Sequence, residues 1–354
     1  MLKKFLEDNF TNYNGMVCNQ DKKTRIEFID LAKGICIFLV VIYHTEIVRF
    51  DIPGLKAVRM PLYFILSGLF FKNYGGIFQL ALRKVNKILV PFLFFYIISW
   101  LECTLLDLAP WNTTPVAEPF HALFTQRIGP IWFLECLFFT VLAFGAICNT
   151  FNSEYMRFIA VIFMGVIGNL LSLKNIFLPC QIDVVFTAMP FFYLGYILKK
   201  TPLLYPSRQD RFALPLGVAM LIAGSVLYYL LDRPFIEFWN NTMKGNLLVN
   251  YILSFIFVIG VMMICKGIKW LPVISYIGRY SIIVLVMHQI VLQFMKTFEP
   301  YLLGYGINYV YFVFTFGISW LSIPVLRKYL PQFTAQADFV KECHIIRLEN
   351  YLKV

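Results

Sequence analysis

Ten apolar segments constrain this 354-residue chain more than any other feature of its sequence. A helix needs about 17–25 mainly apolar residues to cross the hydrocarbon core of a bilayer. Segments of this kind run over 29–48, 56–72, 88–106, 131–149, 156–173, 182–198, 212–231, 247–265, 279–296 and 307–326. Two are weaker, because 56–72 carries Arg59 and Pro61 and 279–296 begins with Arg279. The pattern predicts an all-α, polytopic integral membrane protein with about ten transmembrane helices.

The composition favours the same class. Hydrophobic residues make up 59% of the chain and charged residues 14%, whereas soluble domains are about 45–50% apolar and about 25% charged. The net charge of +11 is spread in short runs between the apolar segments, so we expect a lipid bilayer and no nucleic acid as partner. The 8 Cys are scattered without a CxxC pair, and neither a disulfide framework nor a metal site is expected.

The distribution of Lys and Arg predicts the orientation. With a cytoplasmic N-terminus, 22 of these residues fall in inner segments and 8 in outer ones. This asymmetry favours both termini on the cytoplasmic side of the cell (inner) membrane. The expected organisation is a cytoplasmic segment over 1–28 without a cleavable signal, a transmembrane domain over 29–326 and a cytoplasmic tail over 327–354.

Ionisable residues inside apolar segments are expensive in lipid and are therefore candidates for function. Lys33 and His44 are eleven residues apart, so on a helix they share one face at a separation of about 16 Å. His44 then lies well towards the outer side of the bilayer, and His288 lies near its middle. The other candidates of this kind are Asp30, Glu135 and Asp183.

The charges form a gradient across the predicted bilayer. Three basic residues, Arg83, Lys84 and Lys87, occupy a predicted inner loop, whereas the histidines and carboxylates lie further out. This arrangement suits a cavity that an anionic ligand enters from the cytoplasm, with acid–base chemistry at its far end. Plainer readings remain: a buried histidine can be a packing residue, the basic residues can act only on topology, and Ser67 with Gly68 can form a packing face.

Six segments, in order along residues 25–290, resemble the membrane acyltransferase-3 family. They are RIEFIDLAKGICIFLVVIYH, RMPLYFILSGLFF, RKVNKILVP, GPIWFLECLFF, MPFFYLGYIL and IGRYSIIVLVMH. The first contains the family's helix 1 pattern, a basic residue and a histidine separated by ten positions, here Lys33 and His44. The similarity is greatest to the fucose 4-O-acetylase-like branch, which favours Lys at that position.

The resemblance implies transfer of an acyl group, usually acetyl from acetyl-CoA, to a carbohydrate hydroxyl. It gives His44 the catalytic role, as general base or as the acylated group, with Lys33 as its basic partner. His288, an ionisable residue within an apolar segment, is a further catalytic candidate. Many relatives carry an Arg-x-x-Arg loop after helix 2, which here reads Arg83, Lys84 and Lys87. We expect these three to bind the phosphates of acyl-CoA as a donor substrate, with no bound cofactor. The residues expected to contact the carbohydrate acceptor are Glu135, Asp183, Trp132 and Ser67.

Two other functions are compatible with the sequence. A transporter or flippase for glycans or small acids would use kinked helices, and Pro61, Pro190 and Pro324 lie within apolar segments. Such proteins are often built from repeated halves, which the sequence does not reveal. A non-catalytic scaffold would leave the placement of Lys33 and His44 unexplained. The leading prediction is an O-acyltransferase that modifies a cell-surface or exported polysaccharide or its lipid-linked precursor.

Overall fold

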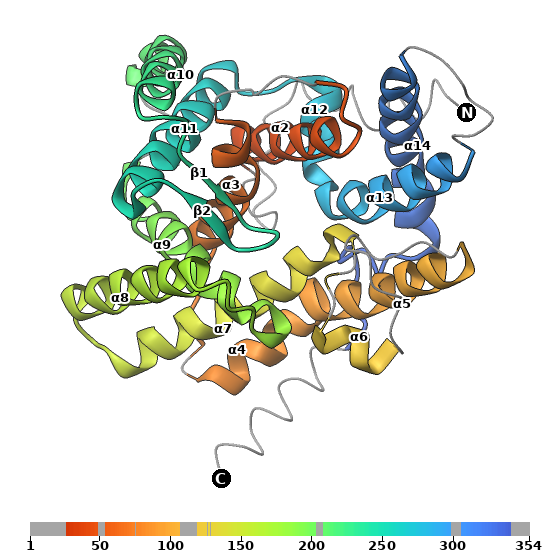
Figure 1. Cartoon of the computed structure of the whole chain (residues 1–354), viewed down its shortest axis with the longest axis horizontal. Helices are drawn as coiled ribbons and strands as arrows, with labels where there is room; N and C mark the ends of the chain where they lie inside the picture. The colour runs from red at the N-terminus through yellow and green to blue at the C-terminus, as the bar shows by residue number, and fades with distance from the viewer. Residues whose placement is uncertain are drawn as a thin grey trace.

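The protein is a bundle of helices with one short hairpin, as a computed structural model shows (Figure 1). The structure describes residues 26–48, 54–74, 76–106, 119–125, 127, 129–202, 208–298 and 306–340. Its elements in chain order are α2 (Glu27–His44), α3 (Leu55–Leu69), α4 (Ile77–Lys84), the π-helix η2 (Val85–Leu89), α5 (Val90–Leu105), α6 (Pro119–Thr125), η3 (Gly129–Ile131), α7 (Trp132–Thr150), α8 (Glu154–Leu173), η4 (Pro179–Gln181), α9 (Ile182–Leu198), η6 (Arg208–Phe212), α10 (Ala213–Leu230), β1 (Phe235–Glu237), β2 (Thr242–Lys244), α11 (Leu247–Ile268), α12 (Pro272–Arg279), α13 (Ser281–Thr297) and α14 (Ile307–Tyr329).

The all-α, polytopic class is confirmed, but the expected number of about ten spans is not reached. Within the described residues, seven helical segments are long and apolar enough to cross a membrane. They are Ile77–Leu105, Gly129–Thr150, Glu154–Leu173, Pro179–Leu198, Asp210–Leu230, Leu247–Ile268 and Ile307–Tyr329. An eighth results if α12 and α13, which meet at a 92° bend, cross as one broken span.

Of the two expected spans that fail this test, one carries several charged residues and the other is short. Helix α2 holds Glu27, Asp30 and Lys33 within its 18 residues, and α3 is only 15 residues long. Both helices lie in the interior, α2 against α3, α11, α12 and α13, and α3 also against α9 and α11. Their polar groups are therefore surrounded by other helices, which is where a membrane protein can hold ionisable side chains.

Helices α8, α10 and α14 form the apolar outside of the bundle. Only 22% of the apolar window of each is buried, compared with 67% for α7 and α9. Large apolar side chains such as Phe163, Ile222 and Val313 are exposed on them. Surfaces of this kind are rare on soluble proteins and suit contact with lipid.

Glycines let α3 and α9 approach each other closely. A Cβ atom at Gly195 would overlap the backbone carbonyl of Ile65, and one at Gly68 would overlap that of Phe192. Small residues at such contacts allow the van der Waals packing that holds membrane helices together. This contact supports the packing reading of Gly68.

Two segments expected as loops are ordered differently. Arg83 and Lys84 end α4 and Lys87 lies on the π-helix η2, so the expected basic loop is helical. Between α10 and α11 the chain forms an antiparallel hairpin in which Ile236 pairs with Met243. Residues 1–25 and 341–354, most of the predicted terminal segments, lie outside the described residues.

Candidate active site

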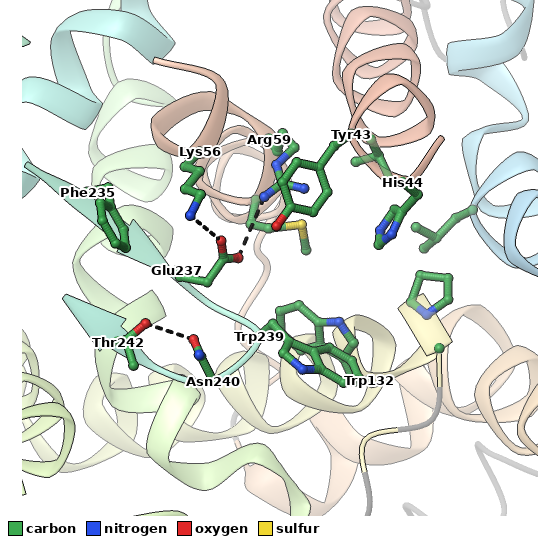
Figure 2. A pocket seen from close by; sticks show the side chains of 15 residues that line it. Tyr43, His44, Lys56, Arg59, Trp132, Phe235, Glu237, Trp239, Asn240 and Thr242 are labelled. Carbon is green, nitrogen blue, oxygen red and sulfur yellow. Dashed lines mark hydrogen bonds and ion pairs between the residues drawn. The ribbon is translucent and has the colours of Figure 1, made fainter. Parts of the chain in front are cut away.

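A cavity of about 400 Å³ opens where the end of α2 meets the start of α3, and we call it the histidine cavity (Figure 2). Elements far apart in the chain contribute to its wall: α2, α3, η3, α7, the hairpin and α13. The lining residues are Val40, Tyr43, His44, Lys56, Arg59, Met60, Gly129, Pro130, Trp132, Phe235, Glu237, Trp239, Asn240, Thr242 and Leu285.

His44, the last residue of α2, lies on the wall of this cavity with His288 of α13 beside it. The centroids of the two imidazole rings are 5.3 Å apart, with the ring planes at 45°. His288 is completely buried, and its Nδ1 lies 3.0 Å from the carbonyl oxygen of Val284. A carbonyl only accepts hydrogen bonds, so Nδ1 carries the proton and Nε2 of the neutral ring is an acceptor. That Nε2 is buried and has no hydrogen-bond partner among the described residues.

An aromatic wall faces the histidine side of the cavity (Figure 2). Trp132 begins α7, and Trp239 lies in the turn of the hairpin, with ring centroids 6.0 Å apart at 77°. Beside them, the Thr242 hydroxyl donates to Oδ1 of Asn240 at 2.8 Å. Flat apolar faces next to a few fixed polar groups are typical of sites for small organic ligands.

The hairpin is fixed in place by buried hydrogen bonds. The hydroxyl of Thr187 on α9 donates to Oδ1 of Asn241 at 2.7 Å. Asn241 has a φ of 46°, in the left-handed region that Asn tolerates better than most residues. The backbone N–H of Met243 donates to the Ser172 hydroxyl of α8 at 3.1 Å. These bonds hold the hairpin residues of the cavity rigidly against the helices.

A charged wall completes the histidine cavity. Lys56 Nζ lies 3.1 Å from Oε2 of Glu237, and a guanidinium nitrogen of Arg59 lies 3.6 Å from Oε1. The Arg59 guanidinium also stacks on the ring of Tyr43, 3.5 Å from its centroid. Two cations from α3 therefore share one carboxylate from the hairpin.

A second cavity of about 370 Å³ lies beyond the other end of α3, and we call it the basic cavity. Its lining residues are Phe71, Lys72, Asn73, Cys148, Arg157, Tyr196 and Lys199. Arg157 is held by Glu154 at 2.7 Å and by the carbonyl oxygen of Phe151 at 2.8 Å. The Lys199 ammonium donates to the carbonyl of Phe71 at 2.8 Å, and Lys72 is exposed. At 1.5 Å per residue, the two cavities are separated by roughly 20 Å along α3.

The structure brings His44, His288 and Trp132 together and places the other predicted site residues elsewhere. Lys33 lies nearer the basic cavity, its Nζ 5.7 Å from the ring centroid of Phe70. The Ser67 hydroxyl donates to the Tyr63 carbonyl of its own helix at 2.8 Å. These two residues do not belong to the described lining of the histidine cavity.

The two predicted carboxylates do not appear in the described lining of the histidine cavity either. Asp183 is completely buried, paired with Arg127 at 2.7 Å, and accepts a hydrogen bond from the backbone N–H of Leu178. Glu135 lines a separate, largely apolar cavity of about 140 Å³ together with Cys180. Among the described residues, no group of three or more His, Cys, Asp and Glu side chains is arranged to hold a metal ion.

The three predicted phosphate ligands do not appear in the described lining of the basic cavity. Lys87 bonds to the carbonyl of Ala335 at 3.2 Å and pairs with Asp338 at 3.3 Å. Arg83 lies over the ring of Tyr74, at 5.7 Å from its centroid. Lys84 is close enough to Lys72 for their charges to interact.

Sequence reasoning missed the charged wall and the hairpin. Arg59 was visible as a charge within an apolar segment, the same signal that singled out His44 and His288. Glu237 and Trp239 carried no such signal, because they lie between two apolar segments, where polar and interfacial aromatic residues are ordinary. Only the tertiary contacts of the hairpin bring them to the cavity.

The acyltransferase domain of the acyltransferase 3 family matches residues 26–325 of this chain. The match covers both cavities and most of the sequence, and the chain belongs to this family. It is a multi-pass membrane acyltransferase. No curated protein and no solved structure matches the chain significantly, so the assignment rests on the family match.

Proposed function

We propose that this acyltransferase moves an acyl group, acetyl in the first instance, from acyl-CoA to a hydroxyl of a cell-surface or exported glycan or its lipid-linked precursor. The observation that carries the proposal is that His44, with His288 beside it, lines the same cavity as two tryptophans and Asn240. An imidazole supplies acid–base catalysis near neutral pH. Aromatic faces with adjacent amide and hydroxyl groups suit a sugar ring and its hydroxyls.

In the proposed reaction, the neutral imidazole of His44 takes the proton of the acceptor hydroxyl. The hydroxyl oxygen attacks the thioester carbonyl, the C–O bond forms and the C–S bond breaks. The CoA thiolate leaves and receives the proton from the imidazolium, which returns His44 to its starting state. His288 has its Nδ1–H bound to Val284 and its Nε2 without a partner among the described residues. In the proposed reaction this Nε2 accepts a hydrogen bond from the His44 ring and orients it. Acylation of His44 itself is the alternative route.

The donor is proposed to bind from the basic cavity. CoA carries several negative charges, and Lys72, Arg157 and Lys199 line that cavity, with Lys84 close by. Cations of this kind attract phosphate groups. The pantetheine arm then extends along α2, past Lys33, towards His44. This assignment moves the phosphate contacts from the predicted set of Arg83, Lys84 and Lys87 towards Lys72 and Lys199.

The proposed orientation of the protein in the membrane follows from the different substrates assigned to the two cavities. The basic cavity is proposed to face the cytoplasm, where acyl-CoA is found, in agreement with the 22 to 8 distribution of Lys and Arg. Reporter fusions at residue 10 and after Val354 should both report the cytoplasm of a cell whose inner membrane holds the protein. An external position of either reporter would contradict this orientation.

The proposed function is tested by comparing exported glycan from cells with and without the protein. We expect ester-linked acyl groups, released by mild alkali and identified by mass spectrometry, only when the protein is present. Labelled acetyl-CoA supplied to isolated membranes should label the same glycan. An unchanged ester content together with an altered amount of exported glycan would favour the transporter or flippase alternative.

A further inference from the structure

Arg59 is a nearly buried cation whose hydrogen-bonding capacity the protein does not use fully. Only 5% of its surface is exposed, and its Nε has no hydrogen-bond partner among the described residues. The carboxylate oxygen Oε1 of Glu237 lies 3.6 Å from a terminal guanidinium nitrogen of Arg59, which is too long for a hydrogen bond. A buried donor without an acceptor is costly, and a buried arginine is ordinarily paired.

The guanidinium of Arg59 is held in a fixed orientation on the cavity wall. Its stacking on Tyr43, at 3.5 Å from the ring centroid, restrains the guanidinium plane. Figure 2 shows Arg59 beside Tyr43, with the dashed contact to Glu237. Such a fork, restrained before the ligand arrives, loses little conformational entropy on binding.

The charges on this wall do not balance. Lys56 and Arg59 supply two positive charges, and Glu237 is the one carboxylate among the described lining residues of the histidine cavity. Lys56 is also restrained, with its Nζ 4.3 Å from the ring centroid of Phe235 and 3.1 Å from Glu237. The wall therefore carries an excess positive charge opposite the two tryptophans.

We infer that the acceptor carries an anionic group, a sugar carboxylate, that binds Arg59 and Lys56 while the acylated hydroxyl faces His44. A carboxylate meets a guanidinium through two parallel hydrogen bonds and compensates the excess charge. A neutral sugar hydroxyl supplies one acceptor and leaves the charge uncompensated. The inference rests on the proposed function, because it names the substrate class of the same cavity.

Binding of small sugars provides the test. The protein, in nanodiscs of phosphatidylcholine, is titrated with D-glucuronate, D-glucose and D-glucose 1-phosphate. We expect glucuronate to bind about tenfold or more tightly than glucose, the size of one charge-assisted contact. Glucuronate binding no tighter than glucose binding, including the case in which neither binds, overturns the inference. Tighter binding of glucose 1-phosphate than of glucuronate overturns the choice of carboxylate and supports phosphate as the anionic group.

Variants test whether the charged wall causes the preference for glucuronate. Arg59→Gln should remove the preference for glucuronate, and Glu237→Gln should strengthen it, because it raises the positive charge of the cavity. Lys199→Gln, in the basic cavity, is the matched control and should leave sugar binding unchanged. Should Arg59→Gln fail to fold, Lys56→Gln, at a half-buried position, tests the same wall with a smaller expected loss. A glucuronate preference that survives in both Arg59→Gln and Lys56→Gln overturns the inference.

Titration with acetyl-CoA distinguishes the acceptor from the donor as the source of the anionic group. Arg59→Gln should leave acetyl-CoA binding unchanged, whereas Lys199→Gln should weaken it. Loss of acetyl-CoA binding in Arg59→Gln would place the donor phosphates on this wall and overturn the inference. Sugar binding requires no acyl transfer, so a negative result here leaves the ester assay of the proposed function standing.

Discussion

The two cavities of this protein are similar in size and both hold cations, but they differ in the other groups that line them. The histidine cavity, about 400 Å³, presents two tryptophans, an amide, a hydroxyl and His44, which has His288 beside it. It also presents Lys56 and Arg59 around one carboxylate. The basic cavity, about 370 Å³, presents three cations from three different segments of the chain. The difference fits a bisubstrate enzyme that recognises a sugar by aromatic faces, polar groups and two cations in one cavity and a polyphosphate by exposed charge in the other.

The two regions also differ in how the chain supports them. A hairpin tied to α8 and α9 by hydrogen bonds closes the histidine cavity. The ends of several helices form the basic cavity, where Lys72 and Lys199 are exposed. Rigid support suits the cavity in which we propose that acyl transfer takes place, because small displacements of catalytic groups are costly. An exposed cluster of cations is sufficient to attract phosphates.

The largest effect is expected from disrupting the close contact between α3 and α9, because the two cavities lie at the two ends of α3. Gly195→Ala introduces a Cβ into the backbone of α3 and should destabilise the protein by about 1–3 kcal/mol, with loss of binding at both cavities. Gly317→Ala is the control, because a Cβ at Gly317 has no neighbour within 4 Å. Thermal unfolding in detergent measures both variants. Equal melting temperatures for the two would show that α3 and α9 do not pack as described.

A strong effect confined to the histidine cavity is expected from His288. His288→Asn keeps a donor for the Val284 carbonyl but lacks the Nε2 acceptor, so acyl transfer should fall about 100-fold or more. Acetyl-CoA binding and protein yield should be unchanged. A variant with normal transfer would make His288 a packing residue. A reduced yield with normal transfer per folded molecule would lead to the same conclusion.

An intermediate effect is expected at Lys33, which lies between the two regions. Lys33→Ala should lose most of the transfer activity, because it removes the cation that we place beside the donor arm, whereas Lys33→Arg keeps that charge and should retain substantial activity. The rate of ester formation at saturating acetyl-CoA measures both variants. Equal loss in both would indicate that Lys33 acts through a specific contact of its ammonium group rather than through charge.

The smallest effect is expected in the basic cavity. Lys72→Gln should weaken acetyl-CoA binding about threefold to tenfold and reduce its sensitivity to salt, since exposed charges are screened by ions. Lys87→Gln is the matched control, because Lys87 already pairs with Asp338 and should matter less. Equilibrium binding at two salt concentrations measures the difference. A larger loss in Lys87→Gln would return the phosphate site to the predicted set of basic residues.

Hydropathy alone predicted most of the long helices. The segments 182–198, 212–231 and 247–265 correspond closely to α9, α10 and α11, since a span must be apolar along its full length. The same rule miscounted α2 and α3, because helices shielded by other helices can be short or polar. The composition of the segment does not predict the 92° bend between α12 and α13.

Site residues could be predicted only where a side chain is unusual for its segment, such as an ionisable group in an apolar span, or where the family resemblance includes it. His44, His288 and Trp132 could be identified from the intramembrane charges and from the family resemblance. Glu237, Trp239 and Asn240 lie in a short polar segment, and their place beside His44 depends on tertiary contacts such as Thr187 with Asn241. The sequence indicated the histidines of the candidate site but not the hairpin residues that we propose contact the acceptor.

Single-turnover acyl transfer by the His44→Ala variant tests directly whether His44 is the catalytic residue. The protein, preloaded with labelled acetyl-CoA, is mixed with the glycan, and ester formation is followed over time. His121→Ala, which alters an exposed histidine of α6, serves as the control. If His44 is catalytic, we expect normal acetyl-CoA binding in both variants, normal ester formation in the control and none in His44→Ala. Ester formation at the normal rate in His44→Ala would contradict this role.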